Sequence, residues 1–270
     1  MKSIALFLIL FLSGSSAFSQ LKLTIYNEKI ATGYTIFADN DEYCPVSTKI
    51  DFELKNLSSS SGSSNTFLVP ARTKKYVLTT LTIIDQNAGY GFKNKSNSNY
   101  GNTNLKDYAD YSYSLPFGIG KPFKVDQGYN GSFSHQNENA LDFTMPVGTE
   151  IFAARAGVVI KVVQVFNQSC PERRCTEYNN YIILYHQDGT FSRYDHLKRN
   201  GALVKEGDSV NENQLIGYSG NVGFSNGPHL HFMAYIQHLM DVESIKTKFK
   251  INDGKEVRLL SEKETYTRNY

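Results

Sequence analysis

Two histidines separated by a single residue stand near the end of the chain, at His229 and His231 in the segment 227–232 (Gly-Pro-His-Leu-His-Phe). On an extended strand successive side chains point to opposite faces, so we expect both imidazoles on one face and Leu230 on the other. Two imidazoles side by side can contact one small object, and the commonest such object is a metal ion. The pair alone does not establish a metal site, because surface histidines also pair by chance. The rest of the chain must supply the missing ligands.

The other candidate ligands lie in the second half of the chain. A catalytic zinc ion takes three protein ligands and leaves a fourth position to water. Histidine nitrogens and carboxylate oxygens are suitable ligands for it. This half contains all six histidines and one carboxylate close to the first of them: His135, His186, His196, His229, His231, His238 and Asp142.

These residues belong to a longer ordered pattern. It runs His135…Asp142-Phe143…Pro146-x-Gly148-Thr149…Ala153-Ala154-x-x-Gly157-x-Val159, then Tyr194-x-His196-Leu197, then Gly227-x-His229-x-His231-Phe232. The pattern resembles the lysostaphin/LytM-type zinc metallopeptidases, bacterial cell-wall endopeptidases that cut the peptide cross-links of peptidoglycan. The resemblance covers about residues 115–235 and does not extend to the N-terminal half or to the tail after about residue 237.

The resemblance implies a function and a set of site residues. It implies that His135, Asp142 and His231 bind zinc, one ion per chain. It also implies that His196 and His229 are the unliganded catalytic histidines. The ion makes its water more acidic and polarises the scissile carbonyl. One neutral imidazole can take the proton of that water, and another can donate to the developing oxyanion. We favour His229 as the base, while the residues leave the assignment between the two histidines open.

The spacing of the first two ligands departs from the commonest family pattern. Six residues separate His135 from Asp142, whereas the common spacing is His-x-x-x-Asp. Glu138 lies inside this longer gap and is the alternative carboxylate ligand. We expect Asp142 to be the ligand, because the segment 140–143 has the strand-like form expected at that position.

Four other residues in or near the pattern, and His238 after it, are not expected to bind the metal. In the related enzymes a histidine at the position of His186 is often present without binding the metal, so we interpret it as structural, and His238 as a surface residue. On a regular strand Tyr194 shares the face of His196, and Asp195 is expected to be solvated on the opposite face. Arg155 is interpreted as an exposed strand residue.

The principal alternative is a family member that has lost catalysis and acts as a cell-wall binding or regulatory protein. Such members usually lack one or more of the five site residues, and this chain keeps all five. The segment 201–218 also resembles half of a biotinyl/lipoyl-type hybrid motif. A carrier domain would need a lysine at a hairpin tip beside methionine or alanine, and the sequence offers no such tip. We therefore expect a zinc metalloendopeptidase.

Composition and patterning predict a mainly β protein. Apolar residues alternate with polar ones at 21–25 and 50–54, which predicts strands with one buried face. The expected fold is an N-terminal β-sandwich-like module followed by an antiparallel β-sheet metallopeptidase domain of the duplicated hybrid motif type. We expect a signal peptide at 1–19, a β-rich N-terminal domain of unknown role at 20–105, the peptidase domain at 106–245 and a C-terminal extension at 246–270. The polar segment 93–104 is predicted to be a linker or long loop at the domain boundary.

The first residues predict export. A basic residue, Lys2, precedes an apolar run at 4–12 and a stretch of small residues that ends near Ser19, which is the pattern of a secretory signal peptide. The run is too short to span a bilayer, so no transmembrane segment is expected after cleavage. The formal net charge of +2 without a basic block argues against a nucleic-acid partner. We expect a periplasmic, cell-surface or secreted bacterial protein whose partners are stem or bridge peptides of peptidoglycan.

The three cysteines have separate interpretations. Cys170 and Cys175 are expected to close a small disulfide loop, which an exported protein can keep. Cys44 is then left over as a small buried apolar residue.

Overall fold

The computed structural model describes residues 21–270. The predicted signal peptide at 1–19 lies outside the described residues. Strands make up nearly all of the regular structure, with a single short 3-10 helix among residues 21–270. The prediction of a mainly β fold is therefore confirmed. No helix in the described part of the chain is long and apolar enough to cross a membrane.

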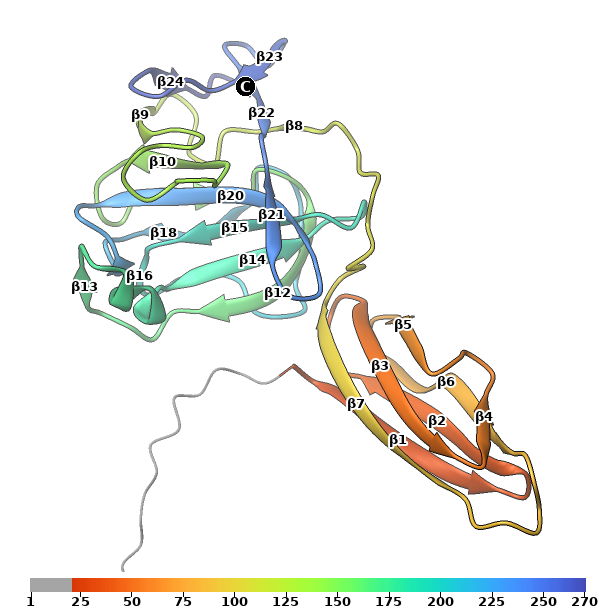
Figure 1. Cartoon of the computed structure of the whole chain (residues 1–270). Helices are drawn as coiled ribbons and strands as arrows, with labels where there is room; N and C mark the ends of the chain where they lie inside the picture. Colours follow the sequence, from red (N-terminus) through yellow and green to blue (C-terminus); the bar gives the residue numbers. More distant parts are fainter. Residues whose placement is uncertain (1–20) are drawn as a thin grey trace, which may run out of the picture.

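The N-terminal part contains two facing sheets, drawn in red to yellow in Figure 1. One sheet has the order β1 (Leu23–Ile30), β2 (Gly33–Asn40), β6 (Thr73–Ile83) and β4 (Leu57–Ser59), and the other has β5 (Ser64–Val69), β3 (Val46–Lys55) and β7 (Gly91–Tyr100). Both sheets contribute buried side chains to one core, including Ile36, Ala38, Ile50, Phe52, Val69 and Leu81. This arrangement agrees with the predicted sandwich-like module.

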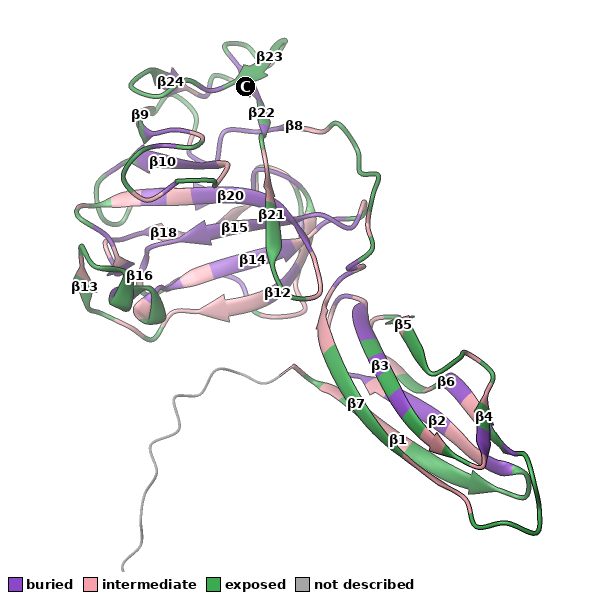
Figure 2. Cartoon of the chain, in the orientation of Figure 1, coloured by how far each residue is buried: buried purple, intermediate pink, exposed green. Residues whose placement is uncertain are grey.

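The prediction of a linker or long loop at 93–104 is wrong for residues 93–100, which form part of a strand. Residues 91–100 form β7, which pairs with β3 along its whole length, from Gly91 opposite Lys55 to Asn99 opposite Ser47. The strand is polar because it lies at the edge of its sheet, where half of its residues are exposed. Figure 2 shows these residues in green. An edge strand of this kind is held by main-chain hydrogen bonds to its neighbour and shows little apolar alternation.

The second part of the chain is built on a long sheet of mostly antiparallel strands. Its order is β17 (Ser209–Val210), β12 (Gly157–Val163), β14 (Tyr181–Tyr185), β15 (Phe191–Asp195), β20 (His229–Gln237), β10 (Ala140–Thr144), β9 (Pro122–Gln127) and β24 (Thr265–Thr267), with β21 (Val242–Ile245) also paired to β20. A second sheet of β11 (Glu150–Phe152), β18 (Leu215–Ser219) and β16 (Leu197–Ala202) packs against it. The shared core includes Leu141, Phe143, Ile151, Tyr194, Ile216 and Phe232.

Residues 246–270 extend this second part. The strand β22 (Lys248–Ile251) pairs with β8 (Ser112–Tyr113) and with β23 (Glu256–Leu259), and β24 pairs with β9. The backbone N–H of Lys263 also donates to the carbonyl of Val125 at 2.7 Å. The end of the chain therefore covers β9, which precedes the first predicted ligand.

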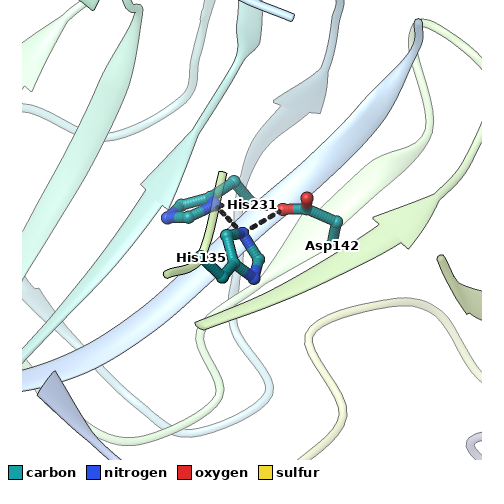
Figure 3. A group of neighbouring side chains, drawn as sticks. All are labelled: His135, Asp142 and His231. Carbon is teal, nitrogen blue, oxygen red and sulfur yellow. Dashed lines mark hydrogen bonds and ion pairs between the residues drawn. The ribbon is translucent and has the colours of Figure 1, made fainter. Parts of the chain in front are cut away.

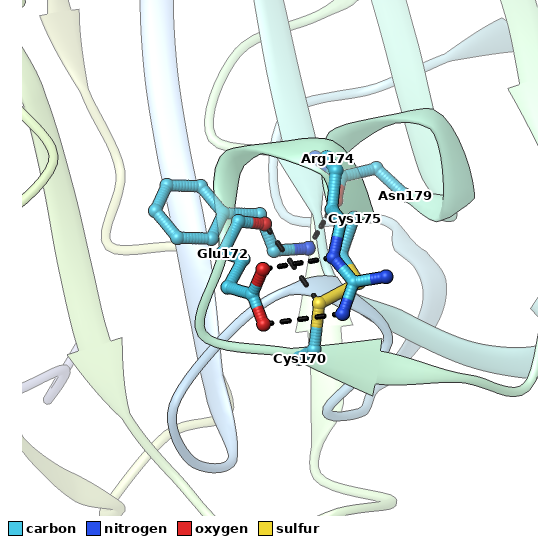
Figure 4. Close-up of a disulfide and its surroundings, with 6 residues drawn as sticks. Cys170, Glu172, Arg174, Cys175 and Asn179 are labelled. Atoms are coloured by element: carbon cyan, nitrogen blue, oxygen red, sulfur yellow. Dashed lines mark hydrogen bonds and ion pairs between the residues drawn. A yellow bond between two sulfur atoms is a disulfide. The ribbon is translucent and has the colours of Figure 1, made fainter.

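A short disulfide loop follows β12. Cys170 and Cys175 are bonded, which confirms the predicted pair, and Figure 4 shows the loop that they close. The loop includes β13 (Ser169–Cys170) and leads into the 3-10 helix η1 (Arg173–Tyr178). The strand β13 pairs in parallel with β19 (Gly223–Phe224), so the loop is fixed to the segment that enters β20.

Cys44 lies where the N-terminal sheets meet the second part. It is fully buried and unbonded, and it packs in a cluster with Phe191, Met233 and Tyr235 of the long sheet. Burial raises the pKa of the Cys44 thiol to about 12, so the thiol stays protonated. Its position agrees with the prediction of a buried apolar residue.

His186 is a structural histidine of the core, as predicted. It is fully buried, and its Nδ1 and Nε2 lie 2.8 Å from the carbonyl oxygen of Ala156 and 2.9 Å from Oγ of Ser192. Burial lowers the pKa of His186 to about 4. The folded protein therefore binds fewer protons here than the unfolded chain, in which the pKa is about 6.5. The resulting stabilisation is present above about pH 6.5 and is lost as the pH falls towards 4.

We expect His186→Gln to flatten the pH dependence of stability in acid. Between pH 7 and pH 5 the parent should lose roughly 2 kcal/mol of unfolding free energy through this residue alone. Urea unfolding at the two pH values measures the loss. His238→Gln, which changes the partly exposed histidine beside Glu243, is the matched control and should keep the parental pH dependence. An identical pH dependence in His186→Gln and the parent would contradict the prediction.

Candidate metal centre

Three neighbouring strands, β15, β20 and β10, and the loops beside them bring the predicted site residues to one face of the long sheet. In the β10–β20 pair, Asp142 lies directly opposite His231 and Thr144 opposite His229. On the other side of β20, Asp195 of β15 also lies opposite His231. Leu230 points into the core, where it is fully buried. The two histidines of β20 thus share a face, as the alternation of strand side chains requires.

Three donor atoms converge above this face, as Figure 3 shows for His135, Asp142 and His231. His135 Nε2 lies 3.2 Å from His231 Nδ1 and 3.2 Å from Asp142 Oδ1, and the last two atoms are 3.0 Å apart. Ligands at 2.0–2.1 Å from a tetrahedral zinc ion are about 3.3–3.4 Å from one another. The triangle therefore has close to the size that a tetrahedral metal site needs. It leaves one side open for a fourth ligand.

Each member of the triangle is held in orientation by a further group. His135 Nδ1 lies 3.0 Å from the carbonyl oxygen of Gly128, to which it donates, so its Nε2 carries the lone pair. His231 Nε2 lies 3.5 Å from Glu138 Oε1. Such partners set the tautomer and direction of a ligating imidazole. Glu138 thus lies beside the other nitrogen of His231, and the carboxylate within the triangle belongs to Asp142.

The charges around the triangle favour a cation. Burial lowers the pKa of His231, but its hydrogen bonds to Asp142 and Glu138 outweigh burial and raise the pKa to about 10. Burial raises the pKa of Asp142, yet the hydrogen bonds from His135 and His231 hold it well below its usual value. The pocket therefore stabilises positive charge at the centre of the triangle. A divalent metal ion with His and Asp ligands fits this donor set.

His196 and His229 lie beside the triangle. Their ring centroids are 4.5 Å apart, and His229 Nε2 is 3.6 Å from Asp142 Oδ1. The Nδ1 atoms lie 2.8 Å from backbone carbonyls, of Val222 for His196 and of Gly227 for His229. Each Nδ1–H donates to its carbonyl, which leaves Nε2 of both rings as an acceptor. Burial, followed by the charge of His229, lowers the pKa of His196 to about 3, so this ring is neutral.

The expectations for Tyr194 and Asp195 are wrong, because the strand does not continue regularly through His196. His196 has a φ of +63°, which turns its side chain to the face of Asp195 instead of that of Tyr194. Tyr194 is consequently fully buried in the core. Asp195 is 2% exposed at the floor of the site, where both its oxygens accept from Arg193 at 2.6 and 2.8 Å.

Arg155 is likewise not an exposed strand residue. It is buried, with its Nη1 2.9 Å from Asp188 Oδ2 and its guanidinium 4.1 Å from the centre of the Tyr111 ring. A counter-ion from the β14–β15 turn and the aromatic face make this burial possible. Arg155 does not line the cleft that contains the triangle.

Gln127 is a site residue that the sequence pattern missed. Its Nε2 donates to Asp142 Oδ2 at 2.9 Å and to Ser134 Oγ at 2.7 Å, and its Oε1 accepts from the N–H groups of Phe133 and Ser134 at 2.9 Å each. One buried amide therefore fixes both the carboxylate of the triangle and the loop that carries His135. A single glutamine eight residues before His135 is too common in sequences to point to a site.

We expect Gln127→Ala to weaken zinc binding about 10–100-fold, because loss of a group that orients a ligand typically has this effect. Competition with a coloured chelator measures the affinity. Gln136→Ala is the matched control, because Gln136 is an exposed glutamine of the same loop that bonds only the carbonyl of Ser132. Equal zinc affinities of the two variants would contradict the role of Gln127.

The triangle opens into a cleft of about 340 Å³. Its walls include Phe133 and Ser134 of the loop before His135, Arg173 and Thr176 of η1, and Glu262 and Lys263 near the end of the chain. Within residues 21–270, no side chain from β1 to β7 lines this cleft. The metal triangle is thus accessible to an extended ligand.

Comparison with known proteins identifies the region around the triangle. Residues 136–243 match the model of Peptidase family M23. The peptidoglycan DD-endopeptidase ShyA of Vibrio cholerae is 37% identical over 94 residues, which are 35% of this chain and 19% of that protein. The glycyl-glycine endopeptidase ALE-1 of Staphylococcus capitis is 36% identical over 124 residues, which are 45% of this chain and 29% of that protein.

A search of solved structures also gives a match in this region. The catalytic domain of lysostaphin from Staphylococcus simulans is 28% identical, and the match covers 46% of this chain and 82% of that one with a TM-score of 0.33. The matches to ShyA and ALE-1 span less than a third of the length of those relatives. The family match begins one residue after His135, and it includes Asp142, His196, His229 and His231.

Proposed function

Residues 136–243 belong to peptidase family M23, and from this premise we propose that the protein is a zinc-dependent endopeptidase that hydrolyses peptide cross-links of bacterial peptidoglycan. The observation that carries the proposal is the triangle of donor atoms from His135, Asp142 and His231, with two further imidazoles beside it. The relatives described as peptidoglycan DD-endopeptidase and glycyl-glycine endopeptidase support the choice of substrate.

The proposed roles follow from the orientation of the side chains. His135 Nε2, His231 Nδ1 and Asp142 Oδ1 would hold the zinc ion. Zinc, when bound, polarises the scissile carbonyl and makes water acidic enough to attack near neutral pH. Gln127 and Gly128 keep Asp142 and His135 directed at the ion.

We assign His229 as the proton acceptor. Both unliganded imidazoles offer Nε2 as an acceptor, but the pKa of His196, lowered to about 3 by burial, makes it the weaker resting base. His229 lies at the edge of the cleft and can pass the proton on to the leaving amine. Neutral His196, whose Nε2 is an acceptor, orients the attacking water.

We also propose that the protein acts outside the cytoplasm, in the periplasm, at the cell surface or as a secreted protein. The disulfide between Cys170 and Cys175 supports this location, because such bonds persist in oxidising compartments. Peptidoglycan, the proposed substrate, lies in the same compartments.

The test is hydrolysis of purified peptidoglycan by the zinc-loaded protein. We expect new amino termini, detected by dinitrophenylation, and muropeptides cut in the peptide, detected by mass spectrometry. Removal of metal with a chelator should stop the release, and added zinc should restore it. Zinc-loaded protein that binds peptidoglycan but releases no amino termini from any type would instead favour a cell-wall binding or regulatory role.

A further inference from the structure

We propose that Arg173 binds a carboxylate of the substrate peptide and so selects peptides with a free carboxylate on the η1 side of the cleft. This inference rests on the proposed peptidase function and adds a specificity-determining residue to it. Arg173 is the first residue of η1 and lies on the wall of the cleft that contains the metal triangle.

The backbone that carries Arg173 is fixed against the site. The Cys170–Cys175 bond closes the loop, as Figure 4 shows, and β13 pairs with β19. Asn179, at the end of η1, accepts from the N–H of Phe224 at 2.9 Å and donates to Asp195 at 3.1 Å. The position of Arg173 relative to β20 is therefore set by a disulfide, a strand pair and two hydrogen bonds of Asn179.

The other charged side chains that line the cleft have partners. Arg193 pairs with Asp195, Lys263 pairs with Asp126 and Glu262, and Glu138 faces His231. Asp142 belongs to the metal triangle.

Arg173 differs from all of these and from its neighbour Arg174. Arg174 makes two bonds to Glu172, at 2.8 and 3.1 Å, so the carboxylate that adjoins Arg173 in the sequence already has a partner (Figure 4). In the part of the chain that the structure describes, no carboxylate lies within 4.0 Å of the Arg173 guanidinium. Among the charged side chains that line the cleft, Arg173 is thus the one that can pair with a carboxylate of a bound ligand.

The ligand that suits such a group is a carboxylate. A guanidinium presents parallel N–H donors that match the two oxygens of a carboxylate, so the pair is bidentate and specific in geometry. A wall peptide can offer this group either as its C-terminal carboxylate or as a side-chain carboxylate. Both carboxylates would bind the guanidinium in the same way. Amidation of the peptide at one position or the other distinguishes them.

The experiment compares matched synthetic peptide substrates. One peptide carries all its carboxylates free, a second has the C-terminal carboxylate amidated, and a third has the side-chain carboxylate amidated. We expect the full-length, zinc-loaded parent to lose about tenfold or more in kcat/KM on one of the two amidated peptides. The peptide affected identifies the source of the carboxylate.

Two variants test whether Arg173 causes the preference for a free carboxylate. Arg173→Gln should cut the free and the amidated peptides at the same rate, close to the parental rate on the sensitive amide. Arg174→Gln is the matched control in the same loop, and it should keep the parental preference. A merely structural role of Arg173 would lower the rates on all three peptides together.

The proposal is overturned if the parent cuts all three peptides equally well, or if Arg173→Gln keeps the parental preference. A parent that cuts none of the peptides and releases nothing from peptidoglycan would instead contradict the proposed peptidase function.

Discussion

His231→Ala is expected to lose both the metal ion and the hydrolytic activity. His231 Nδ1 is within 3.0–3.2 Å of both other donor atoms, so its removal leaves two ligands where a catalytic zinc site needs three. Zinc content after dialysis should fall from about one ion per chain to under about a tenth. The hydrolysis rate should fall at least about a thousandfold, because the ion supplies several kcal/mol of transition-state stabilisation.

The control for this variant is His238→Ala, which removes the same side chain from a position outside the cleft. It should keep the zinc content and the rate of the parent. Elemental analysis and release of amino termini from peptidoglycan are measured on the same samples. If His231→Ala still holds one zinc ion per chain, then Glu138 or another group completes the site and the proposed ligand set is wrong.

Much of the fold follows from local patterns in the sequence. The alternation at residues 50–54 predicts the strand that the structure contains as β3, whose inward residues Ile50 and Phe52 are buried. The two histidines of β20 share a face because the period of a strand is two residues. The disulfide could be predicted because Cys170 and Cys175 are separated by a short loop. In each case the deciding interaction is close in sequence.

The errors arise where distant residues or a single dihedral angle decide the outcome. The strand β7 is polar and is defined by pairing with β3, about 45 residues earlier. His196 adopts a left-handed conformation that puts its side chain on the face of Asp195, and no side-chain pattern announces this. Arg155 is buried because Asp188 reaches it from another turn. None of these effects is visible in a short window of sequence.

The groups that orient the ligands of the metal triangle could not be predicted from the sequence either. Two groups orient His135 and Asp142: the backbone carbonyl of Gly128, which accepts from His135, and a common glutamine, Gln127, which donates to Asp142. The last turn of the chain adds to this support, because Glu262 accepts from the N–H of Gly128 at 3.1 Å. The long gap between His135 and Asp142 is thus compatible with a compact triangle because residues outside the gap hold both of its ends.

His229→Ala is expected to keep the zinc ion and to lose most of the activity. His229 Nε2 lies 3.6 Å from Asp142 Oδ1 and is not one of the three atoms of the triangle, so the ligand set stays intact. Loss of a positioned general base typically costs about 10²–10⁴ in rate. Zinc content should therefore stay near one ion per chain while kcat falls by that factor and KM changes little.

Three outcomes separate the possible roles of His229. Full activity on peptidoglycan would exclude it as the base, and loss of zinc would make it a ligand. Retained zinc with a rate lowered 10²–10⁴-fold would agree with the assignment. His196→Ala, measured in parallel, should also keep the metal. Because the two rings are 4.5 Å apart and act on the same proton transfer, the double variant should be little slower than His229→Ala alone.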